Sequence, residues 1–82
     1  MKYWPIGTVL TLYRGTKPLM IFGRRPTQEN TGIEWDYVAC LYPEGYLGDG
    51  YNVFFQQEEI GEILFCGWET REEEVFEKLL HS

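Results

Sequence analysis

The sequence predicts a mainly β fold with one C-terminal helix, an α+β domain in which five antiparallel strands form an SH3-like barrel or a strongly curved sheet. Three observations favour this fold. Short segments rich in β-branched and aromatic residues alternate with Gly and Pro turns, a single helical turn precedes the last of them, and one segment near the C-terminus has helical periodicity. With 82 residues the chain can build one hydrophobic core, so we expect residues 1–82 to form a single domain.

Five segments have the composition of strands. In the first, the alternation places Leu10 and Leu12 in the core. In the third, Tyr37 and Ala39 share one face of the sheet, and Pro43 ends the strand because proline cannot donate to a sheet hydrogen bond. The predicted strands are residues 7–13, 19–25, 34–42, 51–55 and 63–68, with an exposed loop at 26–32 and one helical turn at 56–60.

Residues 71–80 are predicted to form the helix. Thr70 precedes it as an N-cap and Glu73 follows three residues later, which is the capping-box pattern. The acidic residues of the first turn are explained by the helix dipole, which favours negative charge there. The apolar side chains form one stripe, made of Val75, Phe76, Leu79 and Leu80. Because so short a helix is marginal in water, this stripe must dock on the sheet or on a partner.

Charge is distributed unevenly along the chain. Residues 1–43 hold five Lys/Arg and three Asp/Glu, whereas residues 44–82 hold two Lys/Arg and ten Asp/Glu. An acidic domain repels phosphate groups, so we expect no nucleic-acid partner and favour a basic surface on a protein partner. No segment is apolar and long enough to cross a bilayer, and the N-terminus lacks the apolar region of a signal peptide. We therefore expect a cytoplasmic protein with no membrane partner.

The sequence offers no motif for catalysis, for a metal or for another cofactor. The single histidine, His81, and the single serine, Ser82, end the chain, where a nucleophile and its base would be poorly held. The acidic residues 58–62 lack the spacing of a calcium loop. We therefore expect no enzyme, no metal and no other cofactor. A small hydrolase is the unfavoured alternative, and its candidate carboxylates are Glu34, Asp36 and Glu44.

The two cysteines, Cys40 and Cys66, lie in apolar strand-like segments without metal or redox spacing. We expect reduced core thiols, with a cross-strand disulfide as the alternative. Arg24 and Arg25 are a weak candidate for binding, and the alternative is that they are solubilising charges at the edge of the sheet.

The main candidate site is the aromatic loop after the third predicted strand. Tyrosines are rigid and amphipathic, like the anchors of many protein interfaces, but they could equally cover the open end of a small barrel. The predicted partner-binding residues are Tyr42, Pro43, Glu44, Tyr46, Leu47 and Tyr51. The helix stripe from Val75 to Leu80 is the second candidate surface.

Four segments carry a family resemblance. They read I-G-T-V-L at residues 6–10, P-L-M-I-F-G at 18–23, D-Y-V-A-C-L-Y-P-E-G-Y-L-G at 36–48 and E-E-I-G-E-I-L-F-C-G-W at 58–68. With these segments and the acidic helix that follows, the chain resembles a family of small bacterial proteins catalogued as a domain of unknown function. Members occur in type VII secretion loci of Gram-positive bacteria, often beside LXG-type toxins. The pattern D-Y-x-x-C-L-Y-P-E-G is the most specific part of the resemblance.

The resemblance implies an accessory role. The protein would be a cytoplasmic chaperone or targeting factor that holds an LXG-type toxin ready for export. The family has no recognised catalytic motif, in agreement with a non-enzymatic binding module. The alternative is an immunity protein that neutralises such a toxin, with acidic residues opposing a basic toxin surface. A homodimer formed through the aromatic loop also stays open.

Overall fold

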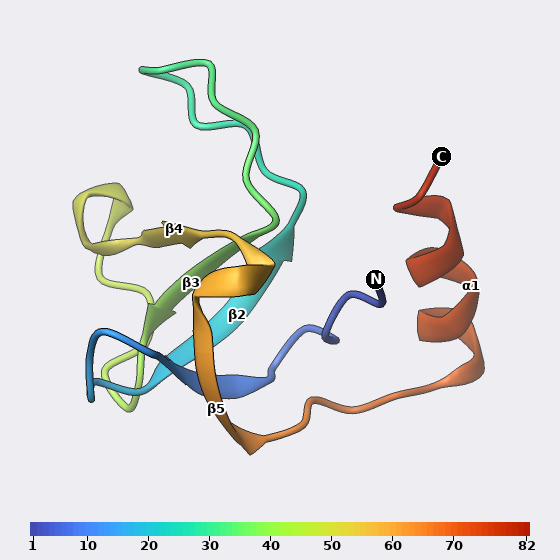
Figure 1. The fold of residues 1–82 in the computed structure, drawn as a ribbon, viewed down its shortest axis with the longest axis horizontal. Coiled ribbons are helices and arrows are strands. Elements are labelled where there is room, and N and C mark those ends of the chain that lie inside the picture. Colours follow the sequence, from blue (N-terminus) through green and yellow to red (C-terminus); the bar gives the residue numbers. More distant parts are fainter.

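The computed structural model describes all of residues 1–82 as a five-stranded antiparallel sheet followed by one helix (Figure 1). The strand order is β4-β3-β2-β1-β5, so successive strands are neighbours except β5, which returns to pair with β1. β4 and β5 are the two free edges, and the predicted alternative of a curved sheet therefore describes the fold better than a closed barrel. The strands are β1 (Val9–Leu12), β2 (Leu19–Arg24), β3 (Tyr37–Leu41), β4 (Val53–Phe55) and β5 (Ile60–Phe65).

Three strands begin later than predicted: β1 begins at Val9 after a turn at residues 6–7, and β3 and β4 begin later because the chain before them has another structure. Residues 34–36 precede β3 and belong to a hairpin extension, in which the Trp35 N–H donates to the Pro26 carbonyl over 2.9 Å. The predicted loop 26–32 is the tip of this hairpin extension, residues 25–36, which projects from the sheet in Figure 1 (green). Residues 49–51 form the 3-10 turn η1 (Asp49–Tyr51), so β4 begins only at Val53.

β5 begins earlier than predicted, at Ile60, and ends at Phe65. The chain leaves the sheet there because Gly67 packs on the N-terminal segment, where its N–H donates to Thr8 Oγ1 over 3.0 Å. A side chain at Gly67 would meet the Ile6 carbonyl oxygen at 2.2 Å, so only glycine fits this contact. The predicted helical turn before β5 is present as the 3-10 turn η2 (Gln57–Glu59).

The core lies on one face of the sheet and follows the predicted alternation. Leu10 and Leu12 are buried, and in β3 Tyr37 and Ala39 point into the core. The Tyr37 ring stacks on Phe55 with 5.3 Å between ring centroids. The core cluster consists of Tyr3, Leu10, Leu12, Leu19, Ile21, Tyr37, Ala39 and Phe55.

The Tyr37 hydroxyl joins three parts of the chain inside this core. It accepts a hydrogen bond from the Trp4 N–H over 2.9 Å and donates to Gln57 Oε1 over 2.6 Å. Burial raises the pKa of Tyr37 to about 12, so the hydroxyl keeps its proton at any ordinary pH. One side chain thus links the N-terminal segment, β3 and the turn before β5.

The helix α1 (Arg71–Leu79) begins as predicted at Thr70, whose hydroxyl accepts from the Glu73 N–H over 3.1 Å. The reciprocal half of the predicted capping box is absent, because the Glu73 carboxylate binds Arg24. Figure 1 shows α1 standing beside the N-terminal segment at one end of the sheet. Its position therefore depends on its contacts with the N-terminal segment and with the end of β2.

Replacing Tyr37 by phenylalanine tests the buried hydroxyl. We expect Tyr37→Phe to lower the free energy of unfolding by about 1–3 kcal/mol, because the Trp4 N–H and the Gln57 side chain lose a partner in the interior. Urea denaturation followed by tryptophan fluorescence measures the change. Tyr13→Phe is the control, since the Tyr13 side chain is exposed. Equal stability of the two variants would contradict the role of the Tyr37 hydroxyl.

Candidate functional site

The helix α1 docks on the body of the protein through an ion pair. Arg24, the last residue of β2, donates from both terminal guanidinium nitrogens to Glu73, over 2.8 and 2.7 Å. The Arg24 side chain is only 3% exposed. The hypothesis that Arg24 is a solubilising charge is therefore wrong, because this guanidinium is a buried cation that requires a fixed carboxylate.

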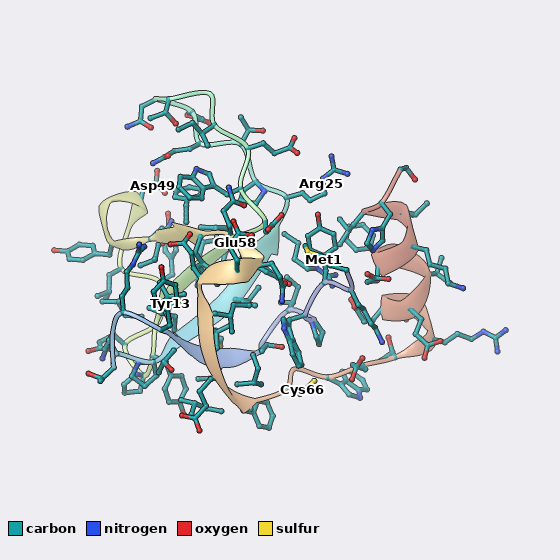
Figure 2. All side chains as sticks on the ribbon, viewed as in Figure 1. Met1, Tyr13, Arg25, Asp49, Glu58 and Cys66 are labelled. Carbon is teal, nitrogen blue, oxygen red and sulfur yellow. The ribbon has the colours of Figure 1, made fainter.

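A second acidic residue of α1 also points inward. Glu77 is buried, and its Oε2 accepts from the Tyr3 N–H over 3.0 Å. His81 Nε2 lies 2.6 Å from the same oxygen. The hydrogen bonds from His81 and from the Tyr3 N–H hold the pKa of Glu77 below its ordinary value of 4.5. Arg25 donates a hydrogen bond to the Leu80 carbonyl, and Figure 2 shows Arg25 near the C-terminal end of α1.

Because Glu73 and Glu77 point inward, most of the apolar stripe of α1 faces solvent. Val75 is 57% exposed, Phe76 51% and Leu79 60%, and only Leu80 packs against the core. Apart from Leu80, the stripe does not dock on the sheet, and docking on a partner stays a prediction. Phe76 also shields the ion pair, with the Arg24 guanidinium carbon 5.4 Å from its ring centroid. We call Val75, Phe76 and Leu79 the exposed face of α1.

The residues predicted for the aromatic loop are all exposed, but the structure does not gather them into one site. The Tyr46 ring packs edge-on against the Phe22 ring with 5.8 Å between the ring centroids, and the Tyr46 hydroxyl donates to Asp49. That hydrogen bond raises the pKa of Tyr46. Glu44 forms an exposed ion pair with Lys17 at 2.8 Å, which lowers the pKa of Glu44. Tyr42, Pro43, Leu47 and Tyr51 point into solvent.

Tyr42 instead contributes to an apolar groove of about 420 Å³ on the face of the sheet opposite the core. The register of β1 and β5 shifts between the pairs Val9↔Phe65 and Leu10↔Ile63, which leaves Leu64 without a partner. This bulge leaves Leu64 and Phe65 both exposed at the groove. Sequence reasoning missed the groove, because an apolar run such as residues 63–65 is typical of a buried strand.

The three carboxylates considered for a hydrolase have separate partners. Glu34 lies 3.4 Å from Arg25, and Asp36 Oδ2 accepts from the Gln57 N–H over 2.8 Å. Together with the Lys17 pair of Glu44, these contacts place the carboxylates in three different environments. No group of three His, Cys, Asp or Glu side chains lies close enough to hold a metal ion.

The two cysteines differ in burial. Both cysteines are free, but only Cys40 is buried, while Cys66 lies exposed beyond β5, where Figure 2 labels it. The prediction of a core thiol is wrong for Cys66, because the chain has left the sheet at that point.

None of the helices has the length and apolar character needed to span a bilayer.

Breaking the ion pair from the side of the helix tests its structural role. We expect Glu73→Gln to lower the free energy of unfolding by about 3 kcal/mol, because the variant leaves the Arg24 cation buried without its counter-charge. Chemical denaturation measures the change. The matched control is Glu74→Gln on the same turn, where the carboxylate is exposed. A loss of the same size in the control would show that helix charge, and not the buried pair, is responsible.

The lowered pKa of Glu77 predicts how stability depends on pH. A carboxyl group whose pKa is lower in the folded protein stabilises the fold above its ordinary pKa of 4.5, and this stabilisation disappears as the pH falls through the folded pKa. We expect the stability difference between the wild type and Glu77→Gln to shrink as the pH falls below 4.5. Denaturation curves across this pH range measure it. A difference that is unchanged in acid would contradict the prediction.

One of the comparisons with known proteins finds a match, and this match covers most of the chain. No curated protein and no solved structure matches the chain. Residues 3–76 match a family described as a domain of unknown function, DUF4176. The match includes all five strands and the first two turns of α1, so it covers both Arg24 and its partner Glu73. The chain therefore belongs to the DUF4176 family.

Proposed function

We propose that this chain is a non-catalytic protein-binding module that serves as a cytoplasmic chaperone or targeting factor for an LXG-type toxin of type VII secretion. The observation that carries the proposal is the orientation of α1. Its exposed face remains in solvent although the helix is amphipathic, while Glu73 and Glu77 turn inward. Contiguous apolar side chains on a surface are typical of a protein interaction site.

The energetics of this face favour a protein partner. Complete burial of one such side chain contributes about 1.5–3 kcal/mol. A partner that covers all three exposed side chains therefore gains enough to offset a substantial part of the cost of association. Charged residues of both signs are exposed on α1 and belong to no ion pair, namely Arg71, Glu72, Glu74 and Lys78. The chain as a whole has a net charge of −6, so a partner with a basic surface around an apolar patch fits best.

The choice of an LXG-type toxin rests on the resemblance of the four sequence segments described above. A chaperone or targeting factor binds the N-terminal LXG region and leaves the toxic activity unchanged. An immunity protein would bind the C-terminal toxic domain and suppress its activity. The two roles therefore differ in the fragment that is bound.

Co-purification with separate fragments of the neighbouring toxin tests the proposal. We expect the wild-type chain to capture the LXG fragment and the double variant Val75→Gln, Leu79→Gln to capture it at least about tenfold less well, because two apolar anchors are lost. Glutamine maintains helix propensity, and Phe76 stays in place to cover Arg24. Capture is measured at low and moderate salt, since a basic partner surface predicts weaker binding at higher salt.

The control is Tyr13→Ser, which removes an exposed aromatic side chain outside α1. Tyr46→Ala tests the aromatic loop by the same assay, and a loss of capture there with normal folding would place the loop in the interface. Equal capture by the α1 double variant and the wild type would remove the exposed face of α1 from the interface. Capture of the toxic domain alone would replace the chaperone role with immunity.

A further inference from the structure

A hollow of about 510 Å³ lies over the outer face of β2, β3 and β4, and no residue of α1 lines it. Its floor is apolar and consists of Phe22, Val38 and Phe54. The register between β2 and β3 shifts so that Phe22 has no partner in β3. Gly23 allows this bulge, because a side chain there would meet Val38 Cγ1 at 2.7 Å. The floor therefore presents two separate aromatic rings, Phe22 from β2 and Phe54 from β4, with Val38 of β3 between the two strands.

Two loops form the walls of this hollow. On one side are residues 26–30 of the hairpin extension, and on the other are Asp49, Gly50 and Asn52. The hairpin side is fixed by Gln28, whose N–H donates to the Ile33 carbonyl over 2.8 Å and whose Oε1 accepts from Trp35 Nε1 over 3.2 Å. Figure 2 shows Asp49 on the loop that faces the hairpin extension.

The charged groups around the hollow have one sign. Glu29 and Asp49 supply carboxylates from opposite walls, and no Lys or Arg lines the hollow. Neither carboxylate belongs to an ion pair, although Asp49 accepts from the Tyr46 hydroxyl. A third acceptor, Asn52 Oδ1, is buried and has no hydrogen-bond partner. A buried acceptor without a donor is costly, and Asn52 is one of the residues that line the hollow.

The geometry points to a binding site for an arginine side chain of a protein partner. A guanidinium group is flat, carries five N–H donors and a permanent positive charge, and stacks on aromatic rings. These properties match a phenylalanine floor between two walls that supply carboxylates. A lysine ammonium lacks the flat surface, and a neutral side chain lacks the charge. The site deepens the proposed function and rests on it, since it gives the protein partner a basic anchor on a surface separate from α1.

Titration of the ¹⁵N-labelled full chain with acetyl-arginine amide tests the site by NMR. We expect saturable shifts of the backbone amides of residues 27–30 and 49–52, with a dissociation constant on the order of millimolar for so small a ligand. Acetyl-citrulline amide, which has nearly the same shape without the charge, is expected to shift them at least about tenfold less at equal concentration. Equal shifts with citrulline, equal shifts with acetyl-lysine amide, or no saturable shifts would each overturn the assignment.

Two isosteric variants identify the carboxylates. Glu29→Gln and Asp49→Asn are each expected to weaken acetyl-arginine amide binding about tenfold, whereas the control Glu62→Gln, an exposed carboxylate on β5 outside the hollow, leaves it unchanged. Asparagine at position 49 can still accept from the Tyr46 hydroxyl, so the loop keeps this contact. Unchanged binding in both variants would also overturn the assignment. The titration needs no toxin fragment, so it can fail while capture of the LXG fragment succeeds, and the two proposals are tested separately.

Discussion

The ion pair between Arg24 and Glu73 determines which side of α1 faces the protein. A guanidinium that is almost fully buried requires a carboxylate, and Glu73 supplies it with two hydrogen bonds. Once Glu73 points inward, helical geometry brings Glu77 to the same side one turn later, where the Tyr3 N–H provides a donor. Val75 and Leu79 lie on the opposite side of the helix. The apolar exposed face of α1 is thus a consequence of satisfying buried charge.

The N-terminal segment connects this helix to the sheet. The centroid of the Tyr3 ring lies 5.3 Å from that of the His81 ring and 5.8 Å from that of the Tyr37 ring. Tyr37 in turn holds the Trp4 N–H and the turn before β5. The position of α1 therefore depends on residues from both ends of the chain and from β2 and β3. Loss of any one of these polar contacts leaves a buried group without a partner, which makes the arrangement specific.

The outer surface has three separate features, and the sequence predicts one of them, the apolar stripe of α1, as the second candidate surface beside the aromatic loop. The exposed face of α1 lies at one end, the groove with Tyr42, Leu64 and Phe65 lies beside β5, and the acidic hollow lies over β2 to β4. Tyr42 lines the groove, whereas Tyr46 lines none of the three features and contacts Phe22 and Asp49 of the hollow. Two bulges produce the groove and the floor of the hollow, because each leaves an apolar residue unpaired on the outer face.

The mainly β fold, the core positions of Leu10 and Leu12, and the start of the helix at Thr70 could be predicted from the sequence. These features depend on alternation and capping, which act between residues close in the chain. Exposure of the aromatic loop could also be predicted, since its Pro and Gly residues favour a turn. The pairing of Arg24 with Glu73, the orientation of α1 and the two bulges depend on contacts between segments far apart in the chain and could not be predicted from the sequence. The ion pair joins residues 49 positions apart, and the partner of a buried charge at such a distance is chosen by packing, which no local pattern records.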